Sequence, residues 1–90
     1  MSALLAVRHT VADYDTWKVG YDQADSLRTE HGCTGEQVYR NPGNPNDIFA
    51  THDFPTVEQA QAFASDPALA AAMKAAGVSS APRIEIFDRA

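Results

Sequence analysis

The chain of 90 residues is poor in cysteine and in positive charge, and each shortage excludes a class of protein. Cys33 is the only cysteine, so neither an intrachain disulfide nor a metal cluster built on cysteines is possible. Seven lysines and arginines stand against 12 aspartates and glutamates, which gives a formal net charge of −5 without any basic run. Such a surface does not neutralise nucleic-acid phosphates or anionic lipids. We therefore expect no nucleic acid and no membrane as partners.

Long hydrophobic runs are also missing. The longest apolar stretch, residues 3–7, is far shorter than the ~20 residues that a membrane-spanning helix needs. No positively charged segment with a cleavage site precedes it. We therefore interpret it as a strand of a cytoplasmic protein. With 44% hydrophobic and 21% charged residues, the composition is typical of one folded domain over residues 1–90.

Hydrophobic spacing and turn residues predict the element order β-α-β-β-α-β. A dense group of asparagine, proline and glycine is expected to form a hairpin loop at residues 41–47. The four strands are expected at residues 3–9, 34–40, 48–54 and 83–88.

Two helices are expected between these strands, each with recognisable ends. The first begins at its cap, Asp13, and ends at Gly32. The second begins with a capping box at Thr56, and Pro67 interrupts it because proline lacks a backbone donor. Gly77 supplies its left-handed end.

This order is typical of the α+β, ferredoxin-like βαββαβ fold, in which the helices cover one face of a four-stranded antiparallel sheet. Short connections place the first and fourth strands side by side and the third between the first and second. Side-chain alternation then defines the other face, called here the uncovered face. Because its predicted residues are too apolar for water, we expect a homodimer in which two sheets pack around a lined cavity. The residues assigned to it are Leu4, Ala6, Arg8, Phe49, Thr51, Glu85, Phe87 and either Val38 or Tyr39.

Three segments resemble a known group of proteins. They are RHTVADYDTW at residues 8–17, LRTEHGCTG at 27–35 and FASDPALAAAMKAAGV at 63–78. The chain is similar over nearly its whole length to small bacterial members of the dimeric α/β-barrel superfamily, which includes antibiotic-biosynthesis monooxygenases, polyketide cyclases and muconolactone isomerases. The members it resembles most are proposed cyclases or uncharacterised proteins. The resemblance implies a two-fold dimer and a small, often aromatic or polyketide-like ligand between sheet and helices. Several branches of the group need no metal or flavin, and we expect no cofactor here.

The end of the first strand carries the residues that most invite a chemical role. Antiparallel pairing of the first and fourth strands brings Arg8 near Glu85, as a salt bridge at the dimer rim or as an anion-binding group in the cavity. Histidine titrates near neutrality, so His9 or Tyr39 is the expected proton-transfer group. The predicted catalytic residues are therefore His9, Arg8 and Tyr39.

Aromatic side chains provide the predicted substrate contacts. Trp17 recurs at helical spacing with Tyr14 and Tyr21, a pattern typical of a buried core stripe that can also form the wall of a pocket. The predicted substrate-binding residues are Trp17, Phe49, Thr51, Glu85 and Phe87.

The three histidines do not predict a metal site. His9 and His52 fall at opposite ends of antiparallel strands, roughly 15 Å apart at ~3.3 Å per residue. His31 has no ligand-type partner one helical turn away. Two functions remain open. One is a cofactor-independent cyclase, isomerase or monooxygenase-like enzyme, and the other is a non-catalytic homodimer that binds a ligand or has a structural role.

Overall fold

The computed structural model describes residues 2–90 and has four strands and four helices in this part of the chain. The strands form one antiparallel sheet in the order β2-β3-β1-β4, which confirms the predicted topology. No helix within residues 2–90 has the length and apolar character to cross a membrane. The elements are β1 (Ala3–Thr10), α1 (Tyr14–Gln23), α2 (Asp25–Glu30), β2 (Gly35–Asn41), β3 (Asn44–Phe54), α3 (Val57–Ser65), α4 (Pro67–Ala75) and β4 (Arg83–Asp88).

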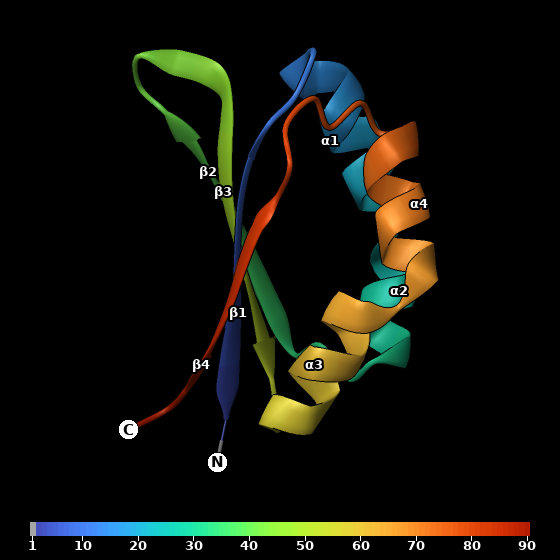
Figure 1. Ribbon diagram of the computed structural model, residues 1–90, viewed down its shortest axis with the longest axis vertical. Coiled ribbons are helices and arrows are strands. Elements are labelled where there is room, and N and C mark those ends of the chain that lie inside the picture. The colour runs from blue at the N-terminus through green and yellow to red at the C-terminus, as the bar shows by residue number, and fades with distance from the viewer. Residues whose placement is uncertain (1) are drawn as a thin grey trace.

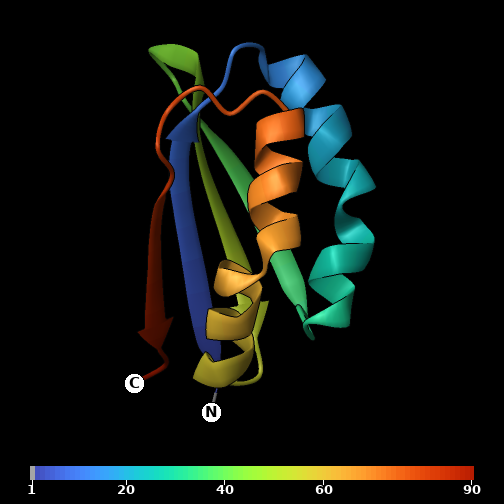
Figure 2. The ribbon, with the colours of Figure 1, turned by 45° about the vertical axis from the view of Figure 1, so that its right-hand side comes forward.

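The molecule has two layers. All four helices lie on one side of the sheet, and the uncovered face has no element against it (Figure 1). In the turned view, α4 crosses in front of the sheet, with α1 and α2 beside it and α3 at the end where the two chain termini lie (Figure 2). The α+β, ferredoxin-like arrangement predicted from the sequence is therefore confirmed.

Local signals set the helix ends as expected. The side chains of Asp13 and Thr56 accept backbone N–H groups at the starts of α1 and α3, and Asp66 does so for α4. Gly32 and Gly77 have φ angles of 87° and 88°, in the left-handed region that favours glycine. These residues therefore fix where the helices begin and end.

The first predicted helix is divided, which the spacing did not predict. Ala24 (φ −87°, ψ 10°) ends α1 and begins the short α2. Its N–H lies 3.2 Å from the carbonyl oxygens of both Gly20 and Tyr21. Arg28 then turns back and donates to the Tyr21 carbonyl at 2.8 Å, so a side chain satisfies a backbone acceptor at the break.

The predicted loop at residues 41–47 was too long. Asn41 pairs with Asn44, so the turn itself contains only Pro42 and Gly43. Asn41 Oδ1 accepts the Gly43 N–H at 2.8 Å, which stabilises the tight turn. Pro45 falls at the register shift after Arg40, where it needs no ladder partner, and β3 therefore continues through it.

The core lies between the sheet and the helices, in two buried clusters. Strand residues of one parity face the helices, in agreement with the alternation expected from the sequence. The first cluster contains Ala3, Leu5, Val7, Phe54, Ala60 and Phe63, and the second contains Val11, Trp17, Ile48 and Ala76. Between the two clusters lie the buried imidazoles of His9 and His52.

Candidate functional site

A cavity lies between the sheet and the helices, where the two core clusters meet. It leaves about 50 Å³ for the centres of water-sized molecules, and about 480 Å³ of empty space when its opening is included. The smaller volume accommodates a few waters or a ligand group of similar size. The lining is mostly apolar. It consists of Val7, His9, Trp17, Gly20, Tyr21, Ala24, Arg28, Ala50, His52, Phe63, Leu69, Ala72, Met73 and Ala76.

Stacked rings form one wall of the cavity. Trp17 and Tyr21, one helical turn apart on α1, stack with ring centroids 4.8 Å apart. His9 of β1 meets the edge of Trp17 at 5.6 Å, and Phe63 of α3 lies 5.8 Å from His52 of β3. Flat surfaces of this kind suit an aromatic ligand. The expectation that Trp17 can be core and pocket wall at once agrees with this arrangement.

A hydrogen-bonded group of polar side chains closes the cavity at one side. The Tyr21 hydroxyl lies 2.8 Å from His52 Nε2 and 2.9 Å from Glu36 Oε2. Arg28 Nε lies 2.6 Å from the same Glu36 oxygen. The Arg28 guanidinium also lies 4.0 Å from the centroid of the Tyr21 ring. Because the Arg28 side chain is buried, its ion pair with Glu36 compensates the cost of desolvation.

Burial controls the protonation of the cavity groups. Desolvation, followed by the positive charge of Arg28, lowers the pKa of His52 to about 4. Desolvation also lowers the pKa of His9, and it raises the pKa of Tyr21. At pH 7 both imidazoles are therefore neutral, and Tyr21 keeps its proton. Within residues 2–90, Nδ1 of His9, Nδ1 of His52 and Nε of Arg28 are buried without a hydrogen bond, and Arg28 Nε has only its ion pair with Glu36.

The structure does not bring the three predicted catalytic residues together. His9 lines the cavity, whereas its neighbour Arg8 points to the uncovered face because successive strand residues alternate. Tyr39 also lies on the uncovered face, where its ring is 6.3 Å from that of Phe49. Arg8 and Tyr39 share a shallow depression there with Asp47, on the opposite side of the sheet from His9.

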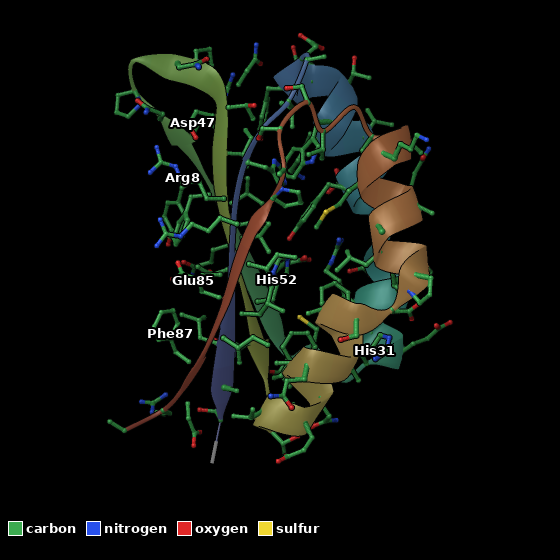
Figure 3. All side chains as sticks on the ribbon, in the orientation of Figure 1. Arg8, His31, Asp47, His52, Glu85 and Phe87 are labelled. Carbon is green, nitrogen blue, oxygen red and sulfur yellow. The ribbon has the colours of Figure 1, made fainter. Side chains whose placement is uncertain are left out.

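The expected pair of Arg8 and Glu85 is not formed. Arg8 NH2 instead lies 2.8 Å from Asp47 Oδ2, and Arg83 Nε lies 3.1 Å from Glu85 Oε1. The strand register explains the difference, because Glu85 is paired with Ala6 while Arg8 faces Arg83. Figure 3 shows Arg8, Asp47 and Glu85 on the side of the sheet away from the helices.

The predicted substrate-binding residues also divide between the two faces. Trp17 lines the cavity, and the other four lie on the uncovered face. Figure 3 shows Phe87 pointing away from the helices and His52 pointing between sheet and helices. Tyr39 rather than Val38 belongs to the uncovered face, because Val38 packs against the cluster of Trp17. The four on the uncovered face are Phe49, Thr51, Glu85 and Phe87.

Sequence reasoning missed four residues of the cavity group. It assigned no chemical role to His52, Glu36 or Arg28. It placed Tyr21 in the core stripe with Trp17. One signal was available in the sequence. Arg28 lies on the same face of the predicted helix as Tyr21, and a charged residue within a buried stripe indicates a partner of opposite charge nearby. Within residues 2–90, no three histidine, cysteine, aspartate or glutamate side chains lie close enough together to hold a metal ion.

Comparison with known proteins shows which fold this chain shares but not which reaction, if any, it catalyses. No family model matches the chain, and no curated protein sequence does. A proposed antibiotic biosynthesis monooxygenase of Bordetella bronchiseptica superimposes with a TM-score of 0.80 at 17% identity, over 99% of this chain and 97% of that chain. SnoaB, a cofactor-independent oxygenase from Streptomyces nogalater, gives 0.78 at 12% identity, over 99% and 93%.

A proposed antibiotic biosynthesis monooxygenase of Caulobacter crescentus CB15 gives a TM-score of 0.76 at 17% identity, over 99% of this chain and 90% of that chain. The present chain has the ferredoxin-like fold of these proteins. Identities of 12% and 17% show a shared fold alone, because one fold hosts many reactions.

Proposed function

We propose that the protein binds a small phenolic or enolisable aromatic molecule in the cavity and removes a proton from it, as the first step of a cofactor-independent oxidation by O₂. The observation that carries the proposal is the pair of buried neutral imidazoles beside stacked rings, with His9 next to Trp17 and His52 next to Phe63. The shared fold with SnoaB, a cofactor-independent oxygenase, supports the same reaction class.

The chemistry requires only a base, a dry site and an electron-rich ligand. A neutral imidazole takes the enol proton, and the resulting carbanion adds O₂ at carbon. The peroxide anion takes up one proton from water in place of the one removed, its O–O bond breaks, and water leaves as the carbon becomes a ketone. For 1,3-dihydroxynaphthalene the balance is C₁₀H₈O₂ + O₂ → C₁₀H₆O₃ + H₂O, and the product is a coloured hydroxynaphthoquinone.

Either cavity histidine can serve as the proton acceptor. His9 is the acceptor expected from the sequence, and the structure adds His52. Arg8 and Tyr39 lie across the sheet from both, so in this proposal they contribute to the uncovered face rather than to proton transfer. The apolar lining excludes water, which strengthens the polar contacts that remain.

The three histidines provide a matched test. We would measure ligand binding by quenching of Trp17, the only tryptophan, and turnover by the absorbance of the quinone from 1,3-dihydroxynaphthalene. The double variant His9→Gln/His52→Gln is expected to lose about 100-fold in turnover. His31→Gln, outside the cavity, is expected to keep it. Wild-type turnover in the double variant would overturn the proposal.

The limited cavity volume of about 50 Å³ favours one alternative, a protein that binds a small ligand without converting it. Saturable quenching of Trp17 together with no quinone above the buffer rate would support this alternative. The absence of any binding would exclude both functions for this ligand class.

We also propose that a second copy of the chain covers the uncovered face. Tyr39, Phe49 and Phe87 are 50%, 41% and 53% exposed there, an unusual set of rings for one open sheet face. Its arginines are already paired with carboxylates of the same face, Arg8 with Asp47 and Arg83 with Glu85. A surface on which both arginines are already paired can meet its own copy about a two-fold axis with little repulsion between the two copies.

The oligomeric state tests this arrangement directly. Sedimentation at micromolar concentration is expected to show a dimer for the wild type and a monomer for Phe49→Asp. Val19→Asp is the control, because Val19 is an exposed apolar residue on α1, away from the sheet. A wild-type monomer, or a Phe49→Asp variant that remains dimeric, would contradict the arrangement.

A further inference from the structure

The Tyr21 hydroxyl is shared between two acceptor-capable groups, and this fixes where its proton lies. The Glu36 carboxylate, paired with Arg28, can only accept hydrogen bonds. Tyr21 has one hydroxyl proton, which it donates to Glu36 at 2.9 Å. Its oxygen, 2.8 Å from His52 Nε2, must then accept a hydrogen bond from the N–H group of that nitrogen. His52 therefore carries its proton on Nε2, and Nδ1 keeps a free lone pair.

The two ends of this hydrogen-bonded chain lie in different surroundings. His52 is 4% exposed and lines the cavity. The Glu36 side chain is 36% exposed and lines a separate polar depression at the start of β2. Arg28 lines both the cavity and this depression. The polar contacts thus run without interruption from the interior of the protein to water.

We propose that His52, Tyr21 and Glu36 form a proton path between the cavity and solvent, with Arg28 as a positioning residue that holds the Glu36 carboxylate. A proton enters at His52 Nδ1, and the Nε2 proton passes to the Tyr21 oxygen. Tyr21 gives its own proton to Glu36, which releases it to water. One proton enters and one leaves, and only N–H and O–H bonds change.

The use of this path rests on the proposed function, because a proton removed from an enol must leave the cavity if the carbanion is to persist until it meets O₂. The path itself exists in the free protein. It can therefore be tested without a ligand, and its failure can be told apart from a failure to bind or convert 1,3-dihydroxynaphthalene.

A network that only fastens α1 to the sheet would have the same tautomer but would not require rapid exchange of the buried ring proton. Nitrogen-15 NMR of the histidine rings at pH 7 distinguishes the two cases. We expect His52 to be protonated at Nε2 and its ring proton to exchange with water despite the burial of the side chain. Finding the proton on Nδ1 in the wild type would overturn the proposal.

Two variants test the links of the path, each with a matched control. Tyr21→Phe keeps the stacked ring but removes the hydroxyl, and it is expected to slow exchange of the His52 ring proton by about tenfold or more. Tyr14→Phe, on the same helix, should not change the rate. Glu36→Gln should also slow exchange, whereas Glu30→Gln on the surface of α2 should not.

The proton path can be tested even if one of the two variants fails to fold. If the NMR spectrum of Tyr21→Phe loses its chemical-shift dispersion, that variant is unfolded. The exchange rate in Glu36→Gln then decides whether the path exists. Unchanged exchange in a folded Glu36→Gln variant, or equal slowing in the control variants, would contradict the proton path. Slowed exchange in a protein that shows no ligand binding would retain the path and reject only its proposed use.

Discussion

The Tyr21 hydroxyl and His52 Nε2 lie 2.8 Å apart, and this contact joins α1 to the centre of the sheet across the cavity. Both side chains also belong to the cavity lining. The same bond that fixes a helix on the sheet thereby fixes the orientation of an imidazole. Changes at this point are expected to affect stability and site chemistry together.

Stability should fall as the pH is lowered from about 6.5 to about 4. Burial holds the pKa of His52 at about 4 in the folded protein, against 6.5 when exposed, so the unfolded chain binds more protons in this range. At most about 3 kcal/mol is lost across the window, by the factor of about 1.4 kcal/mol per pKa unit. The lowered pKa of His9 acts in the same direction.

Urea unfolding at several pH values measures this dependence. His52→Gln should flatten the slope between pH 4 and 6.5, while His31→Gln should leave the contribution of His52 in place. The carboxyl groups of Asp47 and Asp66 have pKa values lowered from 3.8 by Arg8 and His31, so their contribution is lost only at lower pH. An equal slope in His52→Gln and wild type would contradict the assignment.

Removing the buried guanidinium should destabilise the fold. Arg28→Met leaves the Glu36 carboxylate without its ion-pair partner and the Tyr21 carbonyl without its donor. Because Glu36 is partly exposed, we expect a loss of about 2 kcal/mol in the free energy of unfolding rather than the larger cost of a fully buried pair. Lys18→Met, which breaks the exposed pair with Asp22 on α1, should change it by about 0.5 kcal/mol or less.

Chemical denaturation of both variants gives the comparison. If Lys18→Met costs as much as Arg28→Met, burial is not what makes the Arg28 pair important.

Gly77 should resist replacement because of its backbone angle alone. Its φ is 88°, and an added Cβ would meet no atom within 4 Å, so strain rather than crowding determines the effect. Gly77→Ala is expected to cost about 1 kcal/mol of stability. Gly43→Ala, where φ is not positive and the nearest contact is an ordinary 3.5 Å, is the control. Thermal unfolding of the two variants checks the difference, and equal midpoints would contradict it.

The fold was largely predictable because its determinants are local. Asp13, Thr56 and Gly77 mark helix ends by the hydrogen bonds or angles that their own residue types allow. Alternation along β1 and β3 then separated the two faces of the sheet. The strand order followed from short connections.

The site was less predictable because it depends on register and on contacts between distant elements. Arg8 pairs with Asp47 rather than Glu85, because the residue opposite Arg8 on β4 is Arg83, two positions from Glu85. Arg28 is a surface residue type that is buried here and lines the cavity, and its ion pair with the more exposed Glu36 depends on contacts between α2 and β2. No spacing rule within α2 or β2 alone contains that information.

The central claim is that a ligand binds between the sheet and the helices rather than on the uncovered face. Chemical-shift mapping with 1,3-dihydroxynaphthalene tests it most directly, because each face has its own reporters. We predict saturable shifts at the Trp17 indole and at the rings of His9 and His52, with none at Tyr39 or Phe49. Shifts confined to Tyr39 and Phe49, or no saturable shifts at the cavity rings, would contradict it.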